Sequence, residues 1–268
     1  MNKFTEAQLE KAFIDLLDQE QIPHVHGETI DRSPQEVLIK DDLQTFLSEK
    51  YKAEKITQVE IKQIIRQLET YSASDLYESN KAIMKLVSDG FILKREDRSQ
   101  KDLYIQLIDY SGLNDQFASD PEHLITIVAE PVAGYTTHKN IIKFVNQLEI
   151  VGYEKRIPDG ILYINGLPLV VFEFKSAIRE NATIHDAYVQ LTTRYQRDIP
   201  ELFKYNAFCI ISDGINNKAG SFFASYNFYY AWRKVTGADK EEVDGIDSMY
   251  TMVQGMFHPD RLRNIIRN

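Results

Sequence analysis

The dipeptide Asn165-Gly166, which separates the apolar runs GILYI and LPLVVFEFK, constrains the fold of this chain more than any other feature. Both central residues of a type I′ hairpin turn need positive φ angles, and Asn-Gly adopts them readily. The sequence therefore predicts two antiparallel strands, over residues 160–164 and 167–175, that are joined by this turn.

Three charged residues lie in or next to this hairpin, and a buried unpaired charge is costly. Asp159 precedes the first strand, and Glu173 and Lys175 alternate with phenylalanines in the second strand. The two acids stand at similar distances from the turn, so the hairpin brings their carboxyl groups to within about 5 Å of each other. A divalent cation between them, with Lys175 beside it, would account for all three charges. Taken alone, Glu-x-Lys on a strand is also a common ion pair on a solvated face.

The order Pro-Asp followed by Glu-x-Lys is typical of metal-dependent hydrolysis of phosphodiester bonds. Mg²⁺ prefers hard oxygen ligands and keeps several of its waters, and Mn²⁺ has similar preferences. Such an ion polarises the scissile phosphate and lowers the pKa of a bound water. We therefore expect Asp159 and Glu173 to hold the metal and Lys175 to orient the water or stabilise the developing charge.

The remainder of the chain predicts an α/β protein. Apolar residues repeat at helical spacing in the first half of the chain, and short strand-like runs predominate from the middle onward. The expected helices span residues 4–20, 36–51, 56–70, 74–90, 183–197 and 243–268, and the expected strands span 91–98, 102–110, 123–131, 142–152 and 206–214, besides the hairpin.

The helix expected after the hairpin carries a second set of candidate residues. Gln190, Arg194 and Arg197 share one of its faces, and amide and guanidinium groups suit contacts with DNA phosphates. A polar face exposed to solvent is the alternative interpretation. Tyr195 belongs to the apolar stripe of the same helix, which favours a position in the core.

Composition limits the class of protein and its partners. The net charge of −9 argues against a general nucleic-acid coating protein, although residues 155–234 hold 10 Lys and Arg against 7 Asp and Glu. The one cysteine, Cys209, lies in an apolar run, so we expect neither a disulfide within the chain nor a cysteine zinc site. No apolar run approaches the roughly 20 residues that span a bilayer. We expect a cytoplasmic protein without a membrane partner.

Long stretches of the sequence resemble a known family. The run NIIKFVNQLEIVGYEKRIPDGILYINGLPLVVFEFKS, continued by NATIHDAYVQLTTRYQRDIPELFKYNAFCIISDGINNKAGSF, resembles the N-terminal nuclease region of the restriction (motor, R) subunit of type I restriction enzymes. FTEAQLEKAFIDLL, HVHGETI and QGMFHPDRLRNIIRN extend the resemblance over nearly the whole chain. It implies a PD-(D/E)xK restriction-endonuclease-like core, with a mixed β-sheet flanked by helices and an N-terminal helical insertion or lobe.

The resemblance implies a function for the three charged residues of the hairpin. Asp159 and Glu173 would be metal ligands, and Lys175 the catalytic lysine, of a Mg²⁺-dependent endonuclease that hydrolyses double-stranded DNA. Its partners would be the DNA and the methylase and specificity subunits of a type I restriction-modification complex. The motor of this family uses ATP, but no G-x-x-x-x-G-K-[ST] motif occurs in these residues. We therefore expect ATP to act only through motor domains outside this chain.

The family also has a glutamine–tyrosine motif on the helix after the sheet. Gln190 would begin it, but four residues separate Gln190 from Tyr195, whereas the motif usually has three. Arg194 then takes the i+4 position, and we expect Gln190 and Arg194 to contact DNA, with Tyr195 as a further candidate. Glu10 or Glu6 of the first helix could supply another acid to the metal. Exposed helix charges are the alternative for both.

The resemblance divides the chain into four parts. Residues 1–30 would add a helix and a strand to the nuclease core, 31–115 would form a mainly helical lobe, 116–235 the core itself, and 236–268 a helical linker toward the motor. Two other functions remain compatible with the sequence. One is a non-catalytic docking module of the restriction complex, and the other is a stand-alone PD-(D/E)xK repair nuclease.

Two further motifs carry weaker signals. His24 and His26 stand two residues apart on an expected edge strand, which favours surface positions over a metal pair. The aromatic segment 221–232 could stack on bases, although packing against the sheet is the simpler interpretation. Asp213 ends the strand at 206–214 and is a weak site candidate.

Overall fold

A computed structural model describes residues 5–113, 140–175, 183–232 and 246–268 of the chain. The expected strand at 123–131 lies outside these residues. The helices are α1 (Glu6–Gln19), α2 (Lys40–Lys50), α3 (Gln58–Glu69), α4 (Leu76–Asp89), α5 (Ile184–Val189), α6 (Gln196–Asp198), α7 (Pro200–Phe203), α8 (Ile246–Met256) and α9 (Pro259–Arg267). The strands are β1 (His24–His26), β2 (Phe91–Leu93), β3 (Leu103–Ile105), β4 (Ile142–Asn146), β5 (Ile150–Val151), β6 (Lys155–Arg156), β7 (Gly160–Ile164), β8 (Leu167–Phe174), β9 (Phe208–Ser212) and β10 (Asn217–Gly220).

A mixed six-stranded sheet in the order β1-β4-β7-β8-β9-β10 forms the centre of the molecule. The pairs β1–β4 and β8–β9 are parallel, and the other neighbours are antiparallel. β8 is buried along its whole length, as its apolar sequence predicts for an interior strand. The prediction of an α/β protein with a mixed sheet flanked by helices is confirmed.

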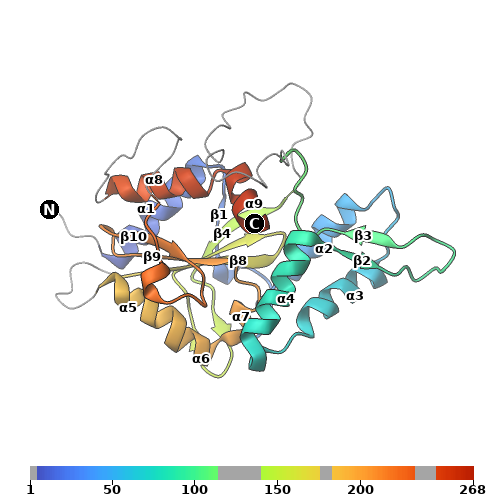
Figure 1. Cartoon of the computed structure of the whole chain (residues 1–268), viewed down its shortest axis with the longest axis horizontal. Coiled ribbons are helices and arrows are strands. Elements are labelled where there is room, and N and C mark those ends of the chain that lie inside the picture. The colour runs from blue at the N-terminus through green and yellow to red at the C-terminus, as the bar shows by residue number, and fades with distance from the viewer. Residues whose placement is uncertain (1–4, 114–139, 176–182, 233–245) are drawn as a thin grey trace.

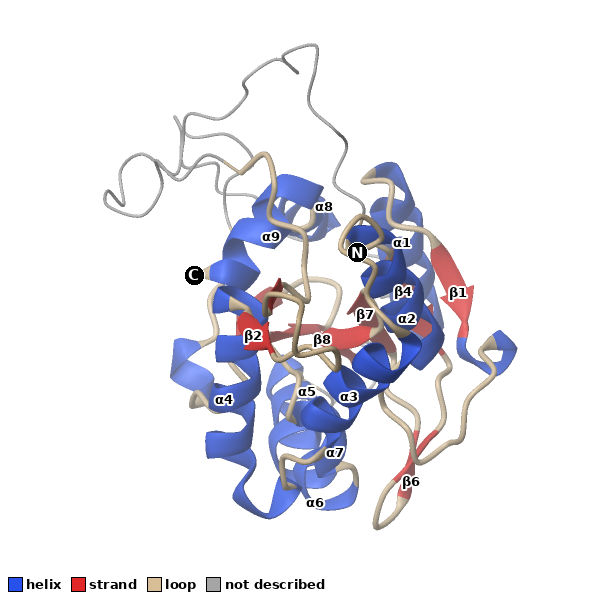
Figure 2. Ribbon diagram, turned by 90° about the vertical axis from the view of Figure 1, so that its right-hand side faces the viewer, coloured by secondary structure: helices blue, strands red, loops and turns tan. Residues whose placement is uncertain are grey.

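Helices cover both faces of this sheet. α1 and α8 lie on one face, and α5 and α6 lie on the other (Figure 1). Phe13 of α1 stacks on Phe174 at 4.7 Å between ring centroids, and Phe257, which follows α8, contacts Phe172 at 5.6 Å. The turned view shows β8 between these two helical layers (Figure 2). The even-numbered phenylalanines of β8 therefore face α1 and α8.

The Asn-Gly hairpin forms as predicted. Asn165 and Gly166 have φ angles of 51° and 79°, and they connect β7 to β8. The Asn165 side chain is fully buried; its Oδ1 accepts from the Ile141 backbone N–H at 2.7 Å, and its Nδ2 donates to the Leu107 carbonyl at 2.9 Å. The turn is thus fixed to the neighbouring segments through hydrogen bonds as well as through its backbone geometry.

A β-bulge in this hairpin sets the position of the charged residues. Ile164 pairs with Leu167 next to the turn, but the register then shifts, and Gly160 pairs with Phe172. Continued by one residue, this register sets Asp159 opposite Glu173, whereas an unbroken hairpin would set Asp159 opposite Phe172. Directly opposite residues share a face of the sheet. The bulge therefore brings Asp159 beside the end of β8, where the Phe174 backbone N–H donates to its carboxylate.

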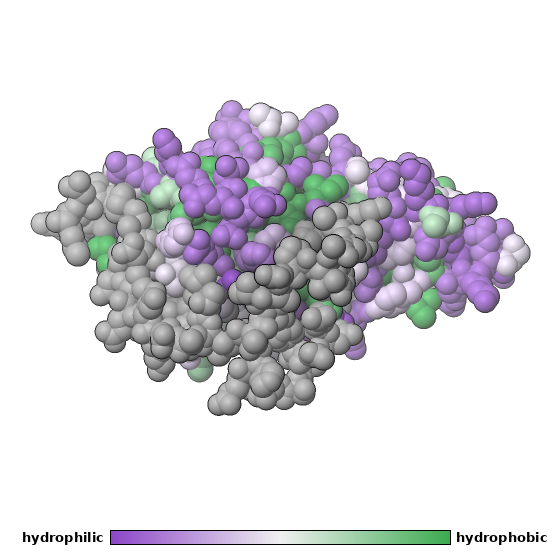
Figure 3. Space-filling model, turned by 90° about the horizontal axis from the view of Figure 1, so that it is seen from above, coloured by the Kyte–Doolittle hydropathy of each residue, from purple (hydrophilic) through white to green (hydrophobic). Residues whose placement is uncertain are grey.

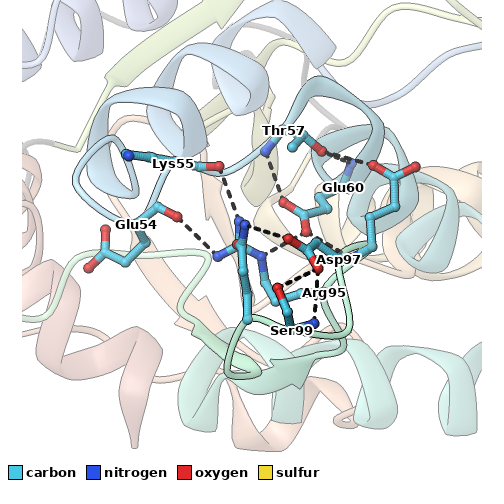
Figure 4. Close-up of polar contacts among 9 residues, drawn as sticks. Glu54, Lys55, Thr57, Glu60, Arg95, Asp97 and Ser99 are labelled. Atoms are coloured by element: carbon cyan, nitrogen blue, oxygen red, sulfur yellow. Dashed lines mark hydrogen bonds and ion pairs between the residues drawn. The ribbon is translucent and has the colours of Figure 1, made fainter.

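The helical lobe consists of α2, α3, α4 and the small β2–β3 hairpin (Figure 1). An ion pair between Arg95 and Glu60 joins its parts, with side-chain exposures of only 5% and 1% and a distance of 2.7 Å. The guanidinium also donates to the carbonyls of Glu54 and Lys55, and Glu60 caps α3 through the Thr57 backbone N–H (Figure 4). The chain after β2 is thereby fixed to the start of α3.

The C-terminal helices pack on the same hydrophobic core as the lobe and the sheet. Arg263 of α9 is buried, and its Nη1 donates to the carbonyls of Asp109 and Ser111 at 2.9 and 2.8 Å. Seen from above, hydrophilic side chains cover most of the visible described surface (Figure 3). Among the described residues, no helix has the length and apolar composition needed to cross a membrane.

Candidate active site

Asp159, Glu173 and Lys175 come together where β7 begins and β8 ends. The Phe174 backbone N–H donates to Asp159 Oδ2 at 2.5 Å, which fixes this carboxylate against β8. Lys175 Nζ donates to Glu173 Oε1 at 2.6 Å and to the Phe174 carbonyl at 2.9 Å. The Lys175 backbone N–H bonds to the Ser212 carbonyl of β9 at 2.9 Å. The three charged side chains predicted from the hairpin therefore form one cluster.

This cluster is unusually buried for a group of charges. Glu173 is 1% exposed, and the Lys175 side chain is 14% exposed. Burial, together with the smaller effect of the nearby Asp159 carboxylate, raises the pKa of Glu173 to about 8, against the effect of Lys175. Burial likewise raises the pKa of Asp159 to about 6. Neither carboxylate is well compensated in its charged form by the protein alone.

Glu10 of α1 lies near this cluster but is held by a different partner. Its Oε1 accepts from Asn146 Nδ2 at 2.6 Å, and Asn146 Oδ1 in turn contacts His24 Nε2 at 2.7 Å. The charges of Glu6 and Glu10 both raise the pKa of Asp159, which places the start of α1 close to that carboxylate. His24 is exposed on edge strand β1, as expected, yet it belongs to this polar chain, which the sequence did not indicate.

A π-helix brings Tyr195 into the site. The residues Gln190–Tyr195 form this segment between α5 and α6, and the Gln196 backbone N–H bonds to the Leu191 carbonyl five residues earlier. Gln190 Nε2 therefore reaches the Tyr195 hydroxyl at 2.8 Å despite the extra residue between them. Tyr195 is buried next to Glu173, and its hydroxyl favours the charged form of that carboxylate. Burial raises the pKa of Tyr195, so its hydroxyl remains protonated.

The two candidate arginines of this helix lie elsewhere. Arg194 is exposed, and it is Tyr195, five residues after Gln190, that makes the side-chain contact with Gln190. Arg197 Nε donates to Asp198 Oδ1 at 2.6 Å, and Arg156 Nε donates to the other carboxylate oxygen at 2.7 Å. Hydrogen bonds from Arg197 and Arg156 lower the pKa of Asp198. Arg156, Arg197 and Asp198 therefore form an ion-pair group that is separate from the cluster.

The residues of the cluster suit a hard divalent cation. Glu173 Oε2 is buried without a hydrogen-bond partner of normal geometry among the described residues, and such an orphaned oxygen calls for a ligand. Two carboxylates provide the oxygen ligands that Mg²⁺ prefers, and Mg²⁺ retains several waters. Within the described part of the chain, no group of three or more His, Cys, Asp or Glu side chains has metal-binding geometry. Asp159 and Glu173 would therefore supply the protein ligands.

The fold and the site together define an α/β protein with a carboxylate–lysine cluster at the ends of two central strands. Residues 3–228 match the family model described as Type I restriction enzyme R protein N terminus. The chain belongs to this family.

Named relatives agree with the family. The type I restriction enzyme HindI endonuclease subunit of Haemophilus influenzae is 33% identical over 198 residues, which cover 72% of this chain and 16% of the relative. The provisionally named type I restriction enzyme MjaIXP endonuclease subunit of Methanocaldococcus jannaschii is 28% identical over 179 residues, 65% of this chain and 15% of that protein. The chain thus spans about a sixth of the length of these relatives.

Proposed function

We propose that this chain is a Mg²⁺-dependent DNA endonuclease domain of the PD-(D/E)xK type, which hydrolyses phosphodiester bonds of double-stranded DNA. The observation that carries the proposal is the buried group of Asp159, Glu173 and Lys175, with its unpartnered carboxylate oxygen. The family supports a nuclease function, since its relatives are named as endonuclease subunits.

Each residue of the cluster has a distinct task in this proposal. Asp159 and Glu173 would hold the ion. When bound, the ion polarises the scissile phosphate and makes a bound water more acidic. Lys175 donates to Glu173 in the absence of substrate, and its ammonium stabilises the negative charge that develops on the phosphate during attack. Tyr195, held by Gln190, packs against Glu173 and orients its carboxylate.

The direct test uses variants that keep the size of the side chains. Glu173→Gln and Lys175→Met should each reduce nicking of supercoiled plasmid by Mg²⁺ to background, while circular dichroism and the unfolding midpoint confirm a folded protein. Glu78→Gln, on the exposed side of α4, is a matched control that should nick like the wild type. Nicking at the wild-type rate by Glu173→Gln would remove the mechanism.

Calorimetric titration with Mn²⁺ or Mg²⁺ separates this proposal from a docking module without catalysis. We expect one saturable site in the wild type that Glu173→Gln weakens strongly. A folded wild-type protein without saturable binding would favour the docking module.

The setting of this activity is part of the proposal. Because the chain spans about a sixth of its relatives, the remainder of a longer subunit would carry the ATP-dependent motor. The methylase and specificity subunits of a cytoplasmic type I restriction-modification complex would then choose the DNA site. The chain's own contribution is cleavage, and its partner is the DNA backbone.

A further inference from the structure

The sheet face that carries Glu173 continues across β9 to β10. Glu173 of β8 pairs directly with Ile211 of β9, and Ile211 pairs directly with Lys218 of β10. Directly paired residues share a face, so Lys218 projects from the same side of the sheet as Glu173. Neighbouring strands lie about 4.8 Å apart, which puts the two Cα atoms roughly 10 Å from each other.

Lys218 has no acidic partner within the described part of the chain. Among the described residues it forms no salt bridge; its ammonium lies 4.4 Å from the centroid of the Tyr226 ring and 3.4 Å from the Tyr226 hydroxyl. The side chain is only partly exposed, so this contact holds the ammonium in one place. A lysine that is held over an aromatic ring, and that no carboxylate of the described residues neutralises, is suited to bind an anion.

The ring contacts of Tyr226 connect Lys218 to α5, the helix that borders the cluster. The His185 ring of α5 packs edge-on against Tyr226 at 4.8 Å, and Tyr188 contacts the same ring at 5.5 Å. Asp186 of the same helix lies close enough to Lys175 for that ammonium to lower its pKa. Tyr226 therefore links Lys218 of β10 to His185 and Tyr188 of α5.

We propose that Lys218 binds a phosphate of the DNA strand that flanks the scissile phosphate, with the Tyr226 ring as the platform that holds its ammonium in place. This inference rests on the proposed function and adds a substrate contact to it. The expected anion is a phosphate of the DNA backbone, because Lys218 lies on the same face of the sheet as Glu173 and two strands away from it. Lys218 positions the duplex and takes no part in bond cleavage.

The test measures DNA binding in EDTA, where no cleavage occurs. Binding of a fluorescently labelled blunt duplex by the 268-residue chain is followed by anisotropy as the salt rises from about 50 to 200 mM. Lys218→Gln should lower the slope of log K against log salt by about 1, as expected for one lost phosphate contact. At about 0.1 M salt the affinity should fall roughly fivefold to tenfold.

Three further variants make the result specific. Lys218→Arg keeps the charge and should keep the wild-type slope, whereas Tyr226→Leu should weaken binding by releasing the ammonium from its platform. Lys81→Gln removes the same charge from the exposed side of α4 and should leave the slope unchanged. Equal slopes for the wild type and Lys218→Gln would overturn this inference alone. Absence of duplex binding by the wild type would overturn the proposed function with it.

Discussion

At the scale of single residues, the burial of the proposed metal ligands costs stability. Glu173 is buried beside a second carboxylate and receives one hydrogen bond from Lys175. A carboxylate in this environment is costly in its charged form, and a metal ion would offset that cost. The burial of Glu173, a proposed ligand, therefore destabilises the metal-free protein whenever Glu173 is ionised.

This cost predicts a pH dependence of stability in the metal-free protein. The unfolded chain releases the Glu173 proton near pH 4.5, but the folded chain releases it only at about pH 8. Because the folded pKa is the higher one, stability is lost as the pH rises from about 5 to 8. In EDTA, Glu173→Gln should remove most of this loss and be about 1–3 kcal/mol more stable than the wild type at pH 8.

Urea unfolding at both ends of this pH range checks the prediction. Glu78→Gln, on an exposed helix face, should unfold like the wild type at each pH. Asp159 also has a raised pKa, so a variant of Glu173 alone should still lose some stability as the pH rises. A Glu173→Gln protein that is less stable than the wild type at pH 8 would contradict the burial argument.

In the Arg95–Glu60 pair of the lobe, removal of one charged partner should destabilise the protein, in contrast to Glu173→Gln. Arg95→Ala should cost about 3–5 kcal/mol in the free energy of unfolding, because it leaves the carboxylate of Glu60 buried and unpaired. The double variant Glu60→Gln with Arg95→Met removes both charges and should recover part of that loss. Chemical unfolding of the wild type and the two variants measures this recovery. A double variant no more stable than Arg95→Ala would contradict the argument.

At the scale of elements, the sequence predicted the hairpin but not its bulge. Asn165-Gly166 has a turn signal that depends only on local φ angles, so the turn and the gathering of three charges could be predicted. The extra residue in β8 is Leu169, since Leu162 pairs with Val170 and Tyr163 pairs with Pro168. Pro168 lacks an N–H, and prolines within sheets favour bulges and strand ends. Without that bulge, the predicted meeting of Asp159 and Glu173 would have failed by one residue.

The π-helix is the second element that sequence spacing could not give. In a regular α-helix, Arg194 at i+4 would lie next to Gln190. In the wider π turn, Tyr195 at i+5 lies next to Gln190 instead. π-helices are rare and often occur at functional sites as single-residue insertions. Lys218 could not be predicted as a site residue for a related reason, since only the pairing of β10 with β9 places it on the face of Glu173.

Deletion of Thr193 tests this account of the π-helix. Thr193 is exposed, and its removal leaves three residues between Gln190 and Tyr195, so a regular α-helix can join the same two residues. We expect unfolding within about 1 kcal/mol of the wild type and retained plasmid nicking, because the π turn holds one surplus residue. Insertion of an alanine after Thr193 is the matched opposite change, and it should abolish nicking. Loss of nicking in the deletion variant would mean that the π turn itself is required.

At the scale of the whole molecule, one core joins parts that are distant in the sequence. The buried apolar residues of the lobe, the sheet and the C-terminal helices form a single cluster. α9 packs beside α4, and its Arg263 bonds to backbone carbonyls at the end of the lobe (Figure 1). The C-terminal residues that the sequence suggested as a linker thus also stabilise the described fold. A site built on the central strands depends on this shared core to hold its geometry.

Removal of α9 should therefore destabilise the lobe and the sheet together. A chain that ends at Phe257 loses the buried side chains of Leu262 and Ile266, and each is worth about 1.5–3 kcal/mol when fully buried. We expect a single unfolding transition that moves as a whole to lower urea, with faster amide hydrogen exchange in both α4 and β8. Removal of Asn268 alone, which is exposed, should change neither. Faster exchange confined to α4, with β8 unchanged, would show that the lobe and the sheet unfold independently and that the core is not shared.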